Sequence, residues 1–133
     1  MSPGRFAGFA TLVFMTIHPS KLGAGLALLG VALGAFGAHM LGDVLSPERL
    51  DTFETAVRYQ MYHALALVAL GALPKSTWRA APFLLWGSVV FSGSLYLLVS
   101  TGIGFLGAIT PIGGILQIIG WGLLVVSLPK QIS

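Results

Sequence analysis

The stretch LGAGLALLGVALGAFGAHMLG, residues 22–42, decides the fold because it contains no charged side chain. A helix of about 20 such residues is long enough to cross roughly 30 Å of membrane hydrocarbon. Three later stretches, residues 56–73, 83–100 and 111–128, are also largely apolar and are separated by polar or turn-forming links. The sequence therefore predicts an all-α fold, a bundle of four transmembrane helices.

The composition of the whole chain also favours a membrane protein. Hydrophobic residues make up 56% of the 133 residues and charged residues only 8%, against about 25% charged in a typical soluble domain. This argues against a soluble globular fold and against intrinsic disorder. The absence of cysteine excludes disulfides and thiolate metal sites. The basic residues are isolated, so nothing favours a nucleic-acid partner.

We predict two parts, an apolar N-terminal extension over residues 1–20 and a four-span membrane domain over residues 21–133. The apolar segment at residues 6–17 is short for a membrane span. Two interpretations stay open for it. It is either an interfacial segment or an upstream extension of a protein whose true start is Met15.

The second span is predicted to begin with an amphipathic extension that projects from the lipid. Ser46 and Pro47 are typical of an N-cap and a first helical residue. From there the helical pattern continues to Leu73, a length of about 40 Å at 1.5 Å per residue. Thr110 before Pro111 predicts the same arrangement at the start of the fourth span.

The placement of Lys and Arg predicts the orientation. With four spans, both termini and the link at residues 74–82 lie on one side. That side carries most of the cations, whereas the other side carries only Arg49 and Arg58 among the four acidic residues. We therefore expect both termini to be cytoplasmic and the acidic loop to face outward.

Small residues at helical spacing predict where the helices pack, because membrane helices approach most closely at small side chains. In the first span they recur along one face, and shorter sets occur in the third and fourth spans. The predicted packing residues are Gly23, Ala27, Gly30, Gly34, Gly37, Ser88, Ser92, Gly113 and Gly120.

Polar side chains gather at one predicted depth, in the outer halves of the spans. Polar groups are costly in a membrane and usually face the bundle interior or a wet cavity. A ligand-binding pocket at this depth is one interpretation, and hydrogen bonds that tie the helix ends together are the other. The residues concerned are His39, Glu54, Tyr59, Gln60, His63, Tyr96 and Gln117.

The function predicted from these residues is non-enzymatic, since no catalytic motif is present. The leading hypothesis is a structural or accessory membrane protein whose polar pocket binds a lipid or a quinone. The alternative is a small oligomeric transporter or channel subunit, and a third is a redox component that uses His39 and His63. No cofactor or metal site is predicted, although quinone, haem and metal stay open. The expected partners are membrane lipids, with a second copy or another membrane protein as alternatives.

Several motifs together resemble a known family. GAFGAHML at residues 34–41, ERLDTFETAVRYQMYHALALV at 48–68, FSGSLYLL at 91–98 and TPIGG at 110–114 with Gly120-Trp121 are similar to the family called domain of unknown function 423. This family includes small bacterial inner-membrane proteins and the eukaryotic transmembrane protein 256.

The resemblance covers about residues 21–128 and implies a multi-pass helical protein of the bacterial inner membrane with no established activity. The segment at residues 1–18 departs from the usual start of the family. The motif positions carried onto this chain are Gly34, Phe36, Gly37, Ala38, His39, Glu54, Tyr59, Gln60, His63, Ser92, Gly93, Ser94, Tyr96, Thr110, Pro111, Gly113 and Gly114.

Overall fold

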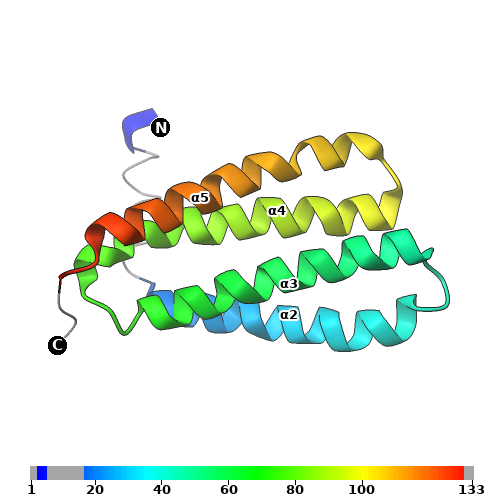
Figure 1. Ribbon diagram of the computed structural model, residues 1–133, viewed down its shortest axis with the longest axis horizontal. Helices are drawn as coiled ribbons and strands as arrows, with labels where there is room; N and C mark the ends of the chain where they lie inside the picture. The colour runs from blue at the N-terminus through cyan, green and yellow to red at the C-terminus, as the bar shows by residue number, and fades with distance from the viewer. Residues whose placement is uncertain (1–2, 6–16, 131–133) are drawn as a thin grey trace.

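The computed structural model of the chain describes residues 3–5 and 17–130, and the described part contains helices and no strands. Four long helices lie side by side and run alternately in opposite directions (Figure 1). The all-α prediction is confirmed. The elements are α2 (Pro19–Leu41), α3 (Pro47–Leu70), the 3-10 helix η1 (Lys75–Ala80), α4 (Ala81–Thr101), the 3-10 helix η2 (Gly104–Ala108) and α5 (Thr110–Ser127).

Three helical stretches of the described chain are long and apolar enough to cross a membrane. They are Pro19–Leu41, Lys75–Thr101 and Gly104–Ser127. The helix α3 does not meet this criterion, because its first half is rich in charged side chains. Length and composition therefore support three membrane spans, one fewer than the sequence predicts.

The helix starts agree with one predicted cap and differ from the other. The Ser46 side chain accepts a hydrogen bond from the Arg49 backbone N–H, so the predicted cap of α3 is confirmed. The prediction for Thr110 was wrong, because this residue is the first of α5 and not its cap. Its hydroxyl oxygen instead lies 2.6 Å from the hydroxyl oxygen of Ser94 on α4.

The beginning of α2 is fixed to the end of α3. The His18 ring caps α2 by accepting a hydrogen bond from the Ser20 backbone N–H. The Ser20 hydroxyl donates to the Val68 carbonyl oxygen at 2.8 Å. The predicted apolar segment at residues 6–17 lies, apart from Ile17, outside the described residues.

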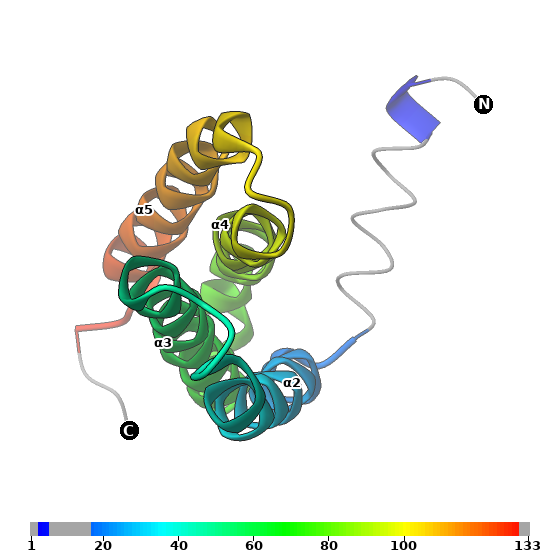
Figure 2. The same ribbon diagram turned by 90° about the vertical axis from the view of Figure 1, so that its right-hand side faces the viewer.

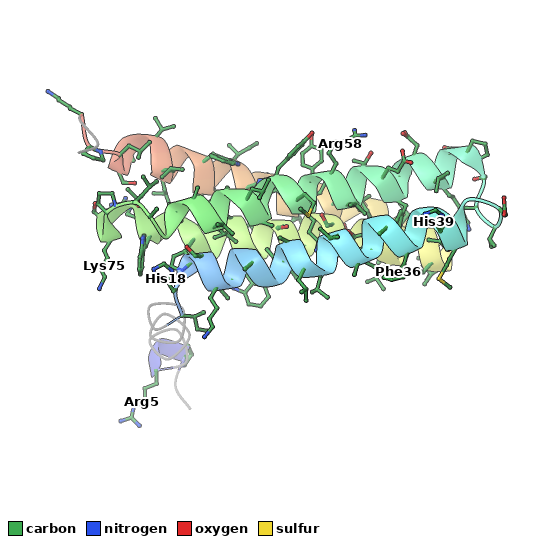
Figure 3. All side chains as sticks on the ribbon, turned by 90° about the horizontal axis from the view of Figure 1, so that it is seen from below. Arg5, His18, Phe36, His39, Arg58 and Lys75 are labelled. Atoms are coloured by element: carbon green, nitrogen blue, oxygen red, sulfur yellow. The ribbon has the colours of Figure 1, made fainter. Side chains whose placement is uncertain are left out.

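The helices pack in chain order. The helix α3 contacts both α2 and α4, and α4 contacts α5, so α2 and α5 lie at opposite edges of the bundle when it is viewed end-on (Figure 2). The apolar core lies where η1 joins α3 to α4, and its cluster is Leu67, Leu70, Ala80, Ala81 and Leu84. The helix α2, in contrast, exposes many large side chains. One of them, Phe36, projects away from the other helices (Figure 3).

Glycines bring α2 close to α3. A Cβ atom at Gly23 would lie 2.5 Å from the Ala64 carbonyl oxygen, and one at Gly34 would lie 3.2 Å from Val57 Cγ1. Gly30 and Gly37 make similar approaches to side chains of α3. The small face predicted for the first span therefore lies against α3 of the same chain, and Ala27 on that helix is half-buried.

The helices α4 and α5 approach each other in the same way. A Cβ atom at Gly113 would collide with the Phe91 backbone, and one at Gly87 would lie 2.8 Å from the Gln117 backbone nitrogen. Gly120 lies against the Leu84 side chain. This close crossing fixes the height of α5 relative to α4.

Candidate functional site

One buried glutamine joins three helices near the middle of the bundle. The Gln60 side chain is 4% exposed, and its Nε2 donates a hydrogen bond to the Leu26 carbonyl oxygen at 2.9 Å. Its Oε1 accepts a hydrogen bond from the Tyr96 hydroxyl at 2.6 Å. Both ends of the Gln60 amide are therefore used in linking α3 to α2 and α4.

A second polar contact joins α3 to α5. His63 Nδ1 lies 2.7 Å from the Tyr59 carbonyl oxygen, and because a carbonyl only accepts, Nδ1 must carry the hydrogen. Nε2 then accepts a hydrogen bond from Trp121 Nε1–H at 3.1 Å. This fixes His63 as the neutral Nδ1–H tautomer, and neither ring nitrogen keeps a lone pair free for a metal or haem iron.

The serines of α4 complete the interior polar contacts. The Ser92 hydroxyl donates to the Ala56 carbonyl oxygen on α3 at 2.7 Å. Ser88 Oγ and Gln117 Nε2 are buried and have no hydrogen-bond partner among the described residues. Most of the buried polar side chains therefore act as links between helices.

The structure brings together only some of the residues predicted to bind a ligand. Gln60 and Tyr96 are bonded to each other, and Gln117 lies on the crossing of α5 with α4. Tyr59 is partly exposed, and its ring packs on Phe91 with 4.6 Å between centroids. Gln60 and Gln117 lie near the midpoints of α3 and α5.

His39 does not join this interior. It is exposed near the end of α2 (Figure 3). Gly30 faces Met61 and Gly37 faces Phe53, so the antiparallel pairing of α2 with α3 separates His39 from His63 by about 17 Å along the helix axes. The two histidines do not form a common site.

Trp121 takes part in the interior hydrogen bonds, but the sequence did not lead us to predict it as a polar partner. Its signal was its position four residues after Gln117, which places both on one face of a helix. An indole N–H in a membrane helix usually finds an acceptor when it faces other helices. The acceptor here, His63 Nε2, could be identified only once the height of α5 was known.

Glu54, the remaining predicted residue, lies on the outside of the bundle beside a groove. This groove, which we call the α2–α3 groove, has a volume of about 300 Å³ and is lined by Gly34, Phe53, Glu54, Val57 and Arg58. Its floor is apolar, whereas the carboxylate and the guanidinium are exposed at its edge. Arg58 projects outward from the helices (Figure 3).

A second hollow of about 250 Å³ lies at the start of α3, where Arg49 approaches Gly102 at the end of α4. Gly102 has a φ of 73°, the left-handed conformation that glycine adopts without strain.

Within the described residues, no group of three or more His, Cys, Asp or Glu side chains is placed to hold a metal ion.

The fold and these contacts define a helical membrane protein whose interior is held by hydrogen bonds between helices. The model of the family described as "Protein of unknown function (DUF423)" matches residues 33–114. The chain belongs to this family, as its motifs suggested.

Curated relatives are also described as membrane proteins. The UPF0382 membrane protein of Staphylococcus epidermidis (strain ATCC 12228 / FDA PCI 1200) is 49% identical over 114 residues, covering 82% of this chain and 93% of the relative. The UPF0382 membrane protein YwdK of Bacillus subtilis (strain 168) is 45% identical over 117 residues, covering 84% and 95%. No solved structure matches the chain.

Proposed function

We propose that this protein is a non-enzymatic, structural or accessory membrane protein that holds a phospholipid in the α2–α3 groove. The observation that carries the proposal is the composition of the groove: its floor is formed by Gly34, Phe53 and Val57, and its edge by Glu54 and Arg58. An acyl chain fits an apolar floor, and a polar headgroup fits a charged edge. A phospholipid combines both.

The interior contacts favour a lipid on the surface over a quinone in the interior. A quinone needs hydrogen-bond donors for its carbonyl oxygens, and Tyr96 and Gln60 are the central polar pair of the bundle. The Tyr96 hydroxyl already donates to Gln60, and the Gln60 amide already donates to Leu26. A quinone bound at this pair would have to break these contacts, whereas the groove is open without any such cost.

Filling the groove tests the proposal. Val57→Trp places an indole on the groove floor, and Leu65→Trp is the matched control because Leu65 is exposed on the same helix and does not line the groove. Native mass spectrometry of protein extracted in a mild detergent should show a retained phospholipid with the wild type and with Leu65→Trp. Val57→Trp should lose it. Equal retention by all three proteins would contradict the proposal.

We also propose that α3 is the fourth membrane span and that both termini are cytoplasmic, in the inner membrane of a bacterium. The helices α2 and α4 run in the same direction (Figure 1), so the chain must return between them, and α3 is the helix that contacts both. The ends of the bundle differ in charge, which supports the orientation. The end with the start of α2 and η1 carries Lys21, Lys75 and Arg79, and Lys130 follows α5.

The chain lacks cysteine, so single cysteines report the topology without background. In intact cells, a membrane-impermeant maleimide should label Asp43→Cys in the loop between α2 and α3. Lys130→Cys and Ser76→Cys should react only after the membrane is opened. Labelling of both Asp43→Cys and Ser76→Cys in intact cells would refute the assignment of α3 as a span.

A further inference from the structure

Two opposite charges at the edge of the α2–α3 groove have no partner among the residues that the structure describes. Glu54 and Arg58 are both exposed, and neither makes an ion pair or a side-chain hydrogen bond with any residue that the structure describes. They are four residues apart, so they lie on neighbouring turns, about 6 Å apart along the helix axis. The groove therefore presents one negative and one positive group side by side.

These charges lie at a depth where the neighbouring helix is wholly apolar. Gly34 of α2 lines the same groove, and α2 has no Asp, Glu, Lys or Arg between residues 22 and 41. Charged side chains beside acyl chains are costly even when an acid and a base partly neutralise each other, so a polar group that pairs with both would stabilise them. On the same helix, Glu48, Arg49 and Asp51 continue the polar surface toward the loop end of α3.

The length of α3 explains how lipid headgroups reach this depth. Between Arg58 and the end of α3 at Leu70 there are 12 residues, or about 18 Å of helix, whereas the hydrocarbon layer is about 30 Å thick. A short uncharged stretch is accommodated by local thinning of the bilayer and by side chains that reach outward. We therefore expect headgroups beside α3 to descend toward Glu54 and Arg58.

We infer that the α2–α3 groove selects a phosphatidylethanolamine, a phospholipid whose headgroup carries a phosphate and a primary ammonium and no further charge. This inference rests on the proposed lipid site and specifies its headgroup. Arg58 donates to the phosphate, for which a guanidinium is well suited. Glu54 accepts N–H hydrogen bonds from the ammonium. A phosphatidylcholine lacks these N–H donors, and the headgroup of a phosphatidylglycerol carries no cation for Glu54.

The experiment uses the full chain in nanodiscs that contain equal amounts of dioleoyl phosphatidylethanolamine, phosphatidylcholine and phosphatidylglycerol. After transfer to a mild detergent, native mass spectrometry gives the retained amount of each lipid. We expect the wild type to retain phosphatidylethanolamine about fivefold over each of the others, the effect of about one exposed charge pair. Glu54→Gln should abolish this preference, and Arg58→Gln should reduce retention of all three lipids.

Asp51→Asn is the matched control, because Asp51 is an exposed acid on the same helix that does not line the groove. It should keep the wild-type preference, and a loss as large as that of Glu54→Gln would overturn the inference. Equal retention of the three lipids by the wild type, together with their loss from Val57→Trp, would overturn the headgroup selectivity and leave the lipid groove standing. Retention unaffected by Val57→Trp would overturn both.

Discussion

Replacing Gln60 by Leu should weaken the bundle, because this side chain links α3 to both of its neighbours. The substitution conserves the approximate size and removes two hydrogen bonds, one to the Leu26 carbonyl oxygen and one from the Tyr96 hydroxyl. The Leu26 carbonyl lies within α2, so it keeps a helical partner. The Tyr96 hydroxyl, in contrast, has no other hydrogen-bond partner among the described residues.

The expected loss in the free energy of unfolding follows from these two lost hydrogen bonds. An interhelical hydrogen bond in a membrane protein contributes about 0.6 kcal/mol on average and up to about 1.7 kcal/mol. Leaving a buried hydroxyl unpaired costs about 1–3 kcal/mol, and the lower end of this range applies to Tyr96 because its contact with Gln60 is only part-buried. Gln60→Leu should therefore destabilise the fold by about 2–3 kcal/mol and Tyr96→Phe by about 1–2 kcal/mol. Because both variants lose the same contact, the double variant should cost about 1 kcal/mol less than their sum.

Reversible unfolding in mixed micelles, followed by circular dichroism at increasing mole fractions of sodium dodecyl sulfate, gives these free energies of unfolding. The control cycle pairs Gln60→Leu with Ser100→Ala, whose exposed hydroxyl donates only to the Tyr96 carbonyl oxygen. That pair should be additive. A coupling between Gln60 and Tyr96 below about 0.3 kcal/mol, the usual scatter for independent sites, would refute the assigned contact.

Two further predictions concern the contacts of α5. Gly113→Ala should destabilise the fold by about 1–3 kcal/mol, because the added Cβ meets the Phe91 backbone, which cannot rotate away. Gly122→Ala on the same helix is the control, because its added Cβ meets nothing within 4 Å. It should be neutral or slightly stabilising in the same unfolding assay. Nitrogen-15 NMR of His63 should show a protonated Nδ1 and an unprotonated Nε2. Trp121→Phe should shift the Nε2 resonance, because it removes the indole N–H that donates to Nε2. A doubly protonated ring at neutral pH would contradict the assigned tautomer.

The sequence predicts the helices well because their signals are local. An uncharged stretch as long as residues 22–42 leaves a transmembrane helix as the simplest structure, and α2 covers nearly that range. Ser46 was identified as a cap because its side chain needs only the next turn of its own helix. Thr110 was misread because its hydroxyl bonds to Ser94 on another helix, a partner that no local pattern reveals.

The site could be predicted only in part, because contacts between helices depend on their relative heights. The residue types were informative: Gln60, His63 and Tyr96 all make polar contacts between helices or within α3. Their grouping with His39 depended on assumed span boundaries. Since α2 and α3 pair along their length with Gly30 beside Met61 and Gly37 beside Phe53, His39 lies beside the first turns of α3, away from Gln60 and His63.

The contrast between α3 and its neighbours limits where this protein can act on another molecule. Ligand chemistry needs polar groups that are not already committed to contacts within the protein, and both ends of the Gln60 amide and both ring nitrogens of His63 make such contacts. Using them would require breaking links that position three of the helices. The charged side chains of α3 are exposed, and none makes an ion pair or a side-chain hydrogen bond with a residue in the described part of the chain. Because a charged helix face persists in a membrane only where something polar meets it, we expect a lipid headgroup to meet this face of α3.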